Sequence, residues 1–229
     1  MIEIYAMKMY EKIDDANYQR LLLCVSEEKQ SRIKRFVNRE DALRTLLADI
    51  LIRVIIHNKI NVSNEAINFV KNKYGKPFLK DISNFYFNLS YSGKWIVCAI
   101  DDKPIGVDIE NIRHVDFDIA KQFFSEEECI DLFTKKGLDR LRYFYDLWTL
   151  KESFIKALGE GISIPLNSFT IKINENSILT IKTGLQKNNY WFRQYDIDNN
   201  YKLSVCGLQN SFPESINIVD ISTLMKFSI

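Results

Sequence analysis

Apolar residues recur at helical spacing in three stretches of the first half of the chain. The apolar face of the longest stretch comprises Leu43, Leu46, Leu47, Ile50, Leu51 and Val54. This spacing predicts a helix over about residues 39–58, for which Asn38 is a suitable N-cap. Shorter patterns predict helices at about 14–24 and 27–36, and Ser26 followed by two glutamates is typical of a helix start.

Alternating apolar and polar positions predict a strand over residues 1–10. Further strands are predicted at 66–72, 85–90, 94–100 and 103–110 and, in the tail, at 168–173, 178–183, 190–196 and 201–207. A second long helix is predicted over about 139–158, ending at Gly159. Ser125 with Glu128 has the form of a capping box that starts another helix.

Helices combined with a small antiparallel sheet in each half favour an α+β fold class over alternating βαβ units. We place the division near Pro104, which gives an N-terminal half, residues 1–104, and a C-terminal half, residues 105–229. The sequence between them contains no low-complexity tract or long linker, so the two halves are expected to pack directly against each other.

Composition narrows the class of protein. The formal net charge of +1 gives no overall field that would attract nucleic acid or a membrane, so any anion site must be local. The four cysteines lie far apart and there are two histidines, which argues against a zinc site of ordinary spacing. The most apolar run, LLADILIRVII, contains Asp49 and Arg53 and is unsuited to span a bilayer. Because the N-terminus also lacks the features of a secretory signal, we expect a soluble, cytoplasmic protein.

Three carboxylates stand out against apolar surroundings. Asp108 and Glu110 alternate on the strand predicted at the start of the second half, so they project from the same side of it. Glu152 lies four residues before Lys156, at the edge of the apolar face of the second long helix. Each feature alone also fits a solvent-facing strand or an exposed ion pair. If the acids belong together, hard oxygen ligands without His or Cys suit Mg²⁺.

Two groups of basic residues could serve a phosphate-bearing ligand. Lys151 falls near the middle of the apolar arc of its helix, where a bound anion or metal would explain it. A basic stretch near the N-terminus holds Lys29, Arg32, Lys34, Arg35, Arg39 and Arg44. Most of these residues are expected to form a solvated helix face. The turns at 74–77 and 88–94 add further donors.

The segments IGVDIE and WTLKESFIK resemble the two signature motifs of the 4′-phosphopantetheinyl transferases. SEEKQSRIKRF, YGKPFL, FNLSYSGKW and FFSEEE are similar to their counterparts in the surfactin-synthetase-activating type, so the resemblance covers nearly the whole chain. It implies a monomer of two similar α+β halves in a pseudo-two-fold arrangement, with coenzyme A in the cleft between them. It also implies transfer of the 4′-phosphopantetheine arm to a serine of an acyl- or peptidyl-carrier protein, with release of adenosine 3′,5′-bisphosphate.

The resemblance also implies roles for individual residues. Asp108, Glu110 and Glu152 would hold Mg²⁺, or Mn²⁺ in its place, and Glu152, Lys156 and Asp108 would be catalytic. The implied coenzyme A contacts are Lys29, Arg32, Arg44, Lys76, Ser90, Tyr91, Lys151 and Lys156. Tyr91 departs from the pattern, because this subfamily often has histidine there. Tyrosine can donate a hydrogen bond to a phosphate but carries no positive charge.

A docking surface for the carrier protein is expected between Lys121 and Leu132, around the helix capped by Ser125. Phe123 and Phe124 lie just before that helix, and at least one of them is expected to belong to the core.

Two other functions are compatible with parts of the pattern. A Mg²⁺-dependent phosphohydrolase of a nucleotide-like substrate would also use clustered acids, but GVDIEN lacks the second Asp and the Thr of the familiar D-x-D-x-T motif. A non-enzymatic carrier-protein-binding module would not need three acids and Lys156. The carrier itself stays open among fatty-acid, polyketide and nonribosomal-peptide types, although the long two-half form is more typical of secondary metabolism.

Overall fold

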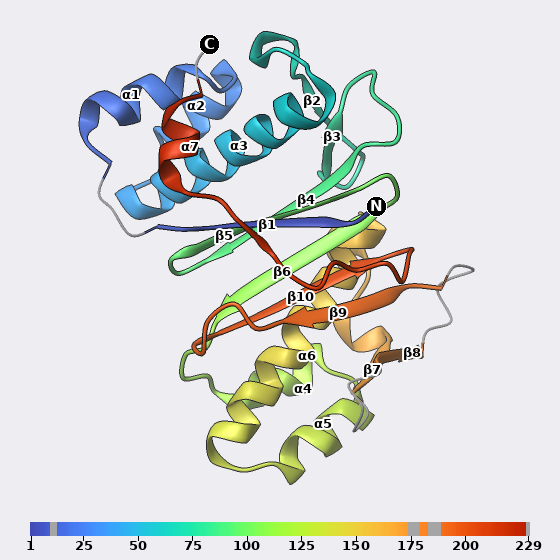
Figure 1. The fold of residues 1–229 in the computed structure, drawn as a ribbon. Helices are drawn as coiled ribbons and strands as arrows, with labels where there is room; N and C mark the ends of the chain where they lie inside the picture. Colours follow the sequence, from blue (N-terminus) through green and yellow to red (C-terminus); the bar gives the residue numbers. More distant parts are fainter. Residues whose placement is uncertain (10–12, 174–178, 183–188, 228–229) are drawn as a thin grey trace.

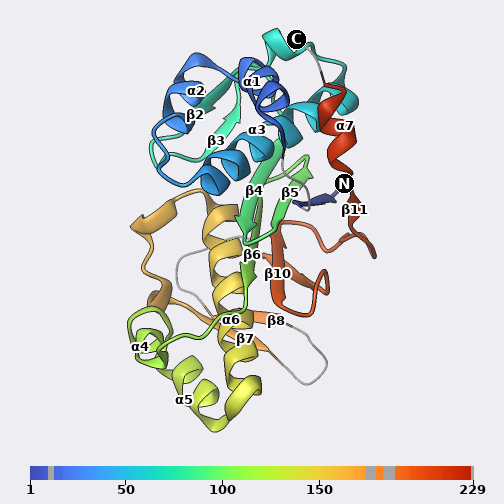
Figure 2. The same cartoon turned by 90° about the vertical axis from the view of Figure 1, so that its left-hand side faces the viewer.

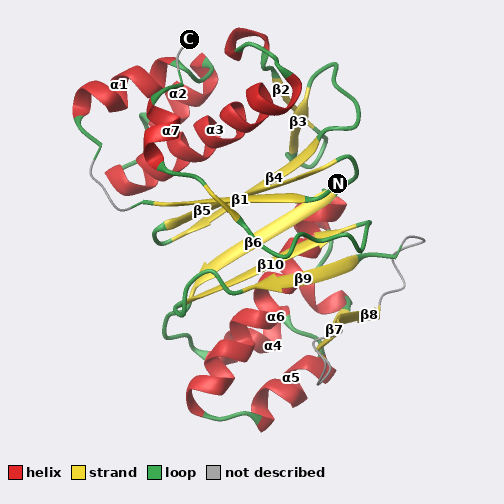
Figure 3. Cartoon of the chain, in the orientation of Figure 1, coloured by secondary structure: helices red, strands yellow, loops and turns green. Residues whose placement is uncertain are grey.

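The chain is arranged in four layers, helices, sheet, sheet and helices, which follow one another from top to bottom in Figure 1. The structure is a computed structural model, in which residues 1–9, 13–173, 179–182 and 189–227 are described. The two main sheets face each other in the middle of the molecule, and helices cover their outer faces (Figure 3). The predicted α+β class is therefore confirmed.

The first half packs its helices on one side of its main sheet. Its strands are β1 (Glu3–Lys8), β2 (Phe69–Lys71), β3 (Pro77–Leu79), β4 (Tyr86–Ser92) and β5 (Trp95–Asp101), and its helices are α1 (Asp15–Leu23), α2 (Glu27–Ile33) and α3 (Arg39–Ile60). α3 is the long helix that the leucine pattern predicts. The predicted N-caps are confirmed, since Ser26 accepts a hydrogen bond from the amide of Lys29 and Asn38 from that of Glu40.

The second half mirrors this arrangement. Its elements are β6 (Ile105–Asn111), α4 (Ala120–Phe123), α5 (Glu126–Thr134), α6 (Gly137–Leu158), β7 (Thr170–Ile173), β8 (Leu179–Lys182), β9 (Trp191–Tyr195), β10 (Tyr201–Gly207), β11 (Asn217–Ile218) and α7 (Ile221–Met225). Ser125 and Glu128 form the predicted capping box at the start of α5. The predicted helix at 139–158 is α6, which begins two residues earlier.

The two halves repeat one order of elements. In the first, β1 leads through the 22-residue helix α3 to the hairpin β2–β3 and then to β4 and β5. In the second, β6 leads through the 22-residue helix α6 to the hairpin β7–β8 and then to β9 and β10. The last strand of each series lies in the middle, giving the orders β1–β5–β4 and β6–β10–β9. This shared topology is what makes the halves similar.

A hydrophobic core lies between the two sheets and belongs to both halves. The first sheet contributes Ile4 and Val97, and the second contributes Val107 and Val205, all four fully buried. The opposite face of each sheet packs on helices, through Cys98 toward α3 and through Cys206 toward α6. The halves therefore pack directly, as the lack of a linker predicts.

The last part of the chain returns to the first half. β11 pairs in parallel with β1, with Tyr5 opposite Asn217 and Ala6 opposite Ile218. Leu224 of α7 is fully buried in the core of the first half. The edge of β1 would otherwise present unpaired backbone groups, and the returning tail covers it. Residues 217–225 thus pack with the first half, and the division at residue 104 stays a prediction.

Candidate active site

Asp108 and Lys156 meet where β6, α6 and β4 come together. The Asp108 carboxylate is buried, and its Oδ1 accepts hydrogen bonds from Lys156 Nζ at 2.5 Å and from Ser90 Oγ at 3.0 Å. Its Oδ2 is the one buried side-chain oxygen or nitrogen of the described residues without a hydrogen-bond partner. An oxygen of this kind is costly to bury, so the site is incomplete as a purely internal ion pair.

Close contact between β6 and α6 brings Lys156 to Asp108 (Figure 2). Gly106 makes this approach possible, since a Cβ atom added there would lie 2.0 Å from the carbonyl oxygen of Ser153 and 2.4 Å from the amide of Ala157. The glycine of the IGVDIE motif therefore sets the distance between the strand that carries Asp108 and the helix that carries Glu152.

Side chains of β4 form a ladder to the backbone of β6. Three alternate residues each accept a hydrogen bond from an amide of β6: Asn88 Oδ1 from Val107 at 2.9 Å, Ser90 Oγ from Ile109 at 3.2 Å and Ser92 Oγ from Asn111 at 3.1 Å. Ser92 Oγ also donates to Glu110 Oε2 at 2.7 Å. Both strand acids, Asp108 and Glu110, are thus held by hydroxyl groups from the first half.

Negative charge exceeds positive charge among these buried groups. Burial raises the pKa of Asp108, and the ammonium of Lys156 opposes the shift. Burial likewise raises the pKa of Glu110 and of Glu152, and the charge of Asp108 raises both further. The Glu152 carboxylate has no hydrogen-bond or ion-pair partner among the described residues. The ammonium of Lys156 thus opposes the raised pKa of all three acids.

These acids fit a hard divalent cation. Their ligand atoms are carboxylate oxygens, the type that Mg²⁺ prefers, and Asp108 Oδ2 needs a partner. Among the residues that the structure describes, no three His, Cys, Asp or Glu side chains already surround a common point as metal ligands. Lys156 is hydrogen-bonded to Asp108 and Ser92 to Glu110, so a cation would have to share these carboxylates with their present partners.

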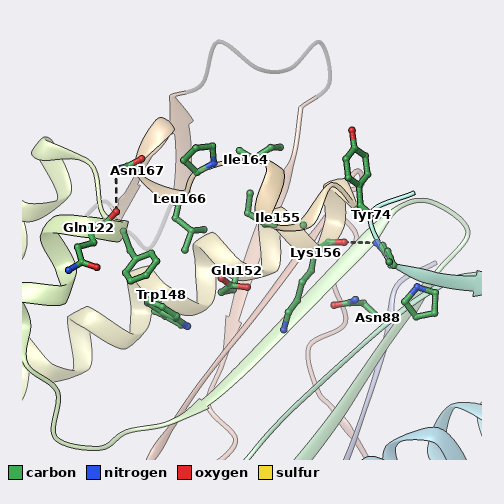
Figure 4. A pocket seen from close by; sticks show the side chains of 17 residues that line it. Tyr74, Asn88, Gln122, Trp148, Glu152, Ile155, Lys156, Ile164, Leu166 and Asn167 are labelled. Carbon is green, nitrogen blue, oxygen red and sulfur yellow. Dashed lines mark hydrogen bonds between the residues drawn. The ribbon is translucent and has the colours of Figure 1, made fainter. Parts of the chain in front are cut away.

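A cleft of about 670 Å³ opens beside Glu152 (Figure 4). Trp148, Glu152 and Lys156, four residues apart on α6, point to the same side of the helix and line it. The turn at 74–77 of the first half closes one end, and an apolar wall comprises Phe123, Trp148, Ile155, Ile164 and Leu166. The cleft thus joins an apolar channel to a charged end.

The residues predicted to contact coenzyme A take different places. Lys76 lines the cleft, but its ammonium donates to the carbonyl oxygens of Ile105 at 3.0 Å and of Lys156 at 2.5 Å. Burial lowers the pKa of Lys76 to about 8. Ser90 is buried within the ladder. Arg44 donates to Asp41 and to the carbonyl oxygen of Gly93. These groups hold the site together in the present arrangement.

Lys29, Arg32 and Tyr91 lie on the first half with greater exposure. Lys29 Nζ is 3.1 Å from Asp49 Oδ2, Arg32 is exposed, and the Tyr91 hydroxyl lies 3.4 Å from Thr45 Oγ1. The described contacts do not join these residues to the three carboxylates. They remain candidates for the phosphates of a ligand that would reach from the first half to the metal site.

Lys151 is not part of the cleft. Its ammonium is fully buried, 2.6 Å from each Glu128 oxygen and from the carbonyl oxygen of Phe169, so its three donor sites are used. Glu128, rather than a bound anion or metal, is the partner of this lysine here, and its predicted coenzyme A contact stays a prediction. Its partner Glu128 also accepts hydrogen bonds from the amides of Ser125 and Ile171.

The predicted docking segment contains both core and cleft residues. Phe124 is buried, as expected for one of the pair, whereas Phe123 lines the cleft and packs edge-on against Trp148 at 5.3 Å between ring centres. Lys121 is exposed and paired with Asp118. The docking role of this segment stays a prediction.

From the sequence, Asn88 and Ser92 are predicted only as part of the donor-bearing turn at 88–94, and Trp148 is not predicted to line the site. The alternation of Asn88, Ser90 and Ser92 in FNLSYS was the available signal, because three polar residues at strand spacing must share one face. Trp148, Glu152 and Lys156 at helical spacing were a second signal.

None of the described helices combines the length and the apolar character that crossing a membrane requires.

Comparison with known proteins places both halves in one family. Residues 12–103 match the family model described as 4′-phosphopantetheinyl transferase, N-terminal, and residues 104–206 match the 4′-phosphopantetheinyl transferase superfamily. The chain is 37% identical over 224 residues to 4′-phosphopantetheinyl transferase Sfp of Bacillus subtilis, covering 98% of this chain and 100% of that protein. It is 42% identical over 211 residues to 4′-phosphopantetheinyl transferase gsp of Aneurinibacillus migulanus, covering 92% and 88%.

Among solved structures, a holo-(acyl-carrier-protein) synthase from Bacillus anthracis in complex with CoA (3′,5′-ADP) matches 47% of this chain and 96% of its own, at 16% identity and a TM-score of 0.42. So slight a likeness carries no argument.

Proposed function

The chain belongs to the 4′-phosphopantetheinyl transferase superfamily and is an enzyme of that class, and we propose that it transfers the arm of coenzyme A to a serine hydroxyl of a carrier protein in a Mg²⁺-dependent reaction. One observation carries the proposal: Glu152 and Lys156 line the charged end of an apolar cleft formed by both halves, and Lys156 is hydrogen-bonded there to the buried Asp108. The released product is adenosine 3′,5′-bisphosphate.

Asp108, Glu110 and Glu152 are the proposed ligands of Mg²⁺. The unpartnered Asp108 Oδ2 and the raised pKa values of all three acids, caused chiefly by burial, support this choice. When bound, the ion would supply positive charge for the diphosphate oxygens of coenzyme A. Mn²⁺ would fit the same oxygen ligands.

Glu152 is the proposed base. The serine oxygen bonds to the phosphorus that carries the pantetheine arm, and the bond from that phosphorus to the bridging oxygen breaks. The bridging oxygen leaves with adenosine 3′,5′-bisphosphate, while the serine proton passes to Glu152. Burial raises the pKa of Glu152 in the metal-free protein, so its carboxylate would accept a proton more readily than that of an exposed glutamate when it is not bound to the ion.

Lys156 is proposed to offset charge on the leaving phosphate. Its ammonium has one carboxylate partner, Asp108, and its side chain is 28% exposed, so it can turn toward a ligand in the cleft. Reactions of this type depend on positioning and charge neutralisation more than on covalent catalysis.

The two ends of coenzyme A are proposed to meet different surfaces. The apolar wall at Phe123, Trp148 and Leu166 suits the pantetheine arm, because it borders Glu152 without adding charge. Lys29, Arg32 and Tyr91 of the first half are the proposed partners of the remaining phosphates. Arg44, Lys76 and Ser90 would act by shaping the site.

We also propose that the enzyme acts as a cytoplasmic monomer. One chain supplies both walls of the cleft, so the proposed chemistry needs no second copy. Gel filtration at working concentration tests the oligomeric state.

The deciding experiment incubates the protein with coenzyme A, Mg²⁺ and an apo-carrier protein and then measures the mass of the carrier. We expect the carrier to gain one phosphopantetheine arm, and Asp108→Ala to abolish nearly all of this gain while the protein stays folded. Consumption of coenzyme A without a modified carrier would favour a phosphohydrolase. Carrier binding without any reaction would favour a binding module, and normal Mg²⁺-dependent transfer by the variant would exclude the proposed metal site.

A further inference from the structure

The ladder between β4 and β6 joins the two sheets and also contacts the carboxylates of the site. β4 and β6 belong to different sheets, and the side chains of Asn88, Ser90 and Ser92 span the junction by accepting from alternate amides of β6. Accepting from an amide fixes the oxygen of each hydroxyl and leaves its single proton to be donated elsewhere.

Both serines donate that proton to a proposed metal ligand. Ser90 accepts from the amide of Ile109 and donates to the carboxylate of Asp108, and Ser92 accepts from Asn111 and donates to Glu110. In each case the amide belongs to the residue that follows the carboxylate in the chain. Asn88 accepts from the amide of Val107, and the residue before Val107 is Gly106, which has no side chain to hold.

Glu110 needs such a partner more than Asp108 does. A glutamate side chain has more rotatable bonds than an aspartate and loses more conformational freedom when it is fixed. Asp108 is held by both Ser90 and Lys156, whereas Ser92 is the hydrogen-bond partner that the described residues give to the carboxylate of Glu110. The bond of 2.7 Å uses Oε2 and leaves Oε1 available to a ligand.

We infer that Ser92 is a positioning residue, which holds the carboxylate of Glu110 in the orientation that binds the divalent cation. This inference rests on the proposed function, because it takes Glu110 as a ligand of the metal. A purely structural role, tying two sheets together, would affect stability but not metal affinity.

The test compares Ser92→Thr with Ser92→Val. The two replacements have nearly the same volume and both suit a strand, but threonine keeps the hydroxyl and valine does not. Calorimetry with Mn²⁺ in the presence of coenzyme A measures the metal affinity, and transfer assays at varied Mg²⁺ measure KM and kcat. We expect valine to weaken Mn²⁺ binding about 10- to 100-fold and threonine to stay near the wild type.

Ser125→Ala is the matched control. It removes a serine hydroxyl that caps α5 and so costs stability, but it touches none of the three acids. We expect its affinity for Mn²⁺ to equal that of the wild type. If Ser92→Val does not fold, Ser92→Ala is compared with Ser125→Ala at matched stability.

Equal Mn²⁺ affinity of the threonine and valine variants, in an enzyme whose wild type transfers the arm, overturns the inference alone. A wild type that transfers no arm at any Mg²⁺ concentration overturns the proposed function and this inference with it.

Discussion

Lys151 and Glu128 form a buried ion pair in the second half, where the apolar arc of the helix would favour an apolar residue. Glu128 ties together the start of α5, the middle of α6 and the strand β7. Burial lowers the pKa of Lys151, and the charge of Glu128 opposes the shift. Each partner is tolerated in the interior only because the other is present.

Lys151→Met should therefore lower the free energy of unfolding by about 3–5 kcal/mol, because it leaves Glu128 buried without its cation. Urea unfolding measures the loss. Lys121→Met, which breaks an exposed pair with Asp118, should cost less than about 1 kcal/mol. If a variant of Lys151 kept full stability but lost affinity for coenzyme A, this lysine would be assigned a contact with coenzyme A.

Glu152 differs from this ion pair, because its charge is proposed to act in the reaction. Its pKa is raised by burial and then by Asp108, so the folded, metal-free protein binds a proton here more tightly than the unfolded chain does. The ionised carboxylate therefore lowers stability as the pH rises from the ordinary glutamate pKa through the raised value.

Glu152→Gln should unfold at a higher temperature than the wild type at pH 7 without metal, and the difference should vanish near pH 4. The same change should lower kcat about 10²- to 10⁴-fold, since the base is lost. Thermal unfolding in chelator and transfer assays measure the two effects. If the variant were less stable than the wild type at neutral pH, the raised pKa of Glu152 would be contradicted.

At the scale of elements, the contact between β6 and α6 positions the reacting groups. Gly106→Ala would place a Cβ atom against the backbone of α6 at Ser153 and Ala157, neither of which can move alone. We expect a loss of about 1–3 kcal/mol in stability. Displacing α6 by about 1 Å should also lower turnover about 100-fold.

Gly207→Ala is the control for this prediction. It alters a strand glycine whose added Cβ atom would meet Ile2 Cδ1 at 3.4 Å, an ordinary contact. Its turnover should stay near that of the wild type. If both variants transfer the arm equally well, the spacing of β6 and α6 does not limit the reaction.

The helices and strands were largely predictable because each has one face on a core. Leu46 and Leu47 show this for α3, and Ser26 and Ser125 mark helix starts through caps that are local in sequence. The pairing of Lys151 with Glu128 was not predictable, since it joins residues 23 positions apart and the capping box already accounts for the glutamate. The alternation in FNLSYS places the three polar side chains of the ladder on one face, but it does not predict that β6 of the other sheet lies against that face.

We expect the whole molecule to unfold as one unit, because the sheets share a core and the tail returns to the first half. Leu224→Ala should lower the free energy of unfolding by about 2–5 kcal/mol, since it leaves a cavity in the core on α3. Urea unfolding followed by tryptophan fluorescence should show a single transition shifted to lower urea. Leu23→Ala, an exposed leucine, should change stability by less than about 0.5 kcal/mol. Two separate transitions would mean that the halves unfold independently.

The returning tail also has a consequence for synthesis on the ribosome. When residue 104 has been added, the first half still lacks β11 on the edge of β1 and the facing sheet that covers Ile4 and Val97. At about 5–20 residues per second, roughly 6–25 s pass before the remaining residues are made. During that interval the nascent chain presents an open strand edge and an apolar face, which are features that chaperones bind. Completion of the first half therefore waits for the last strand to be translated.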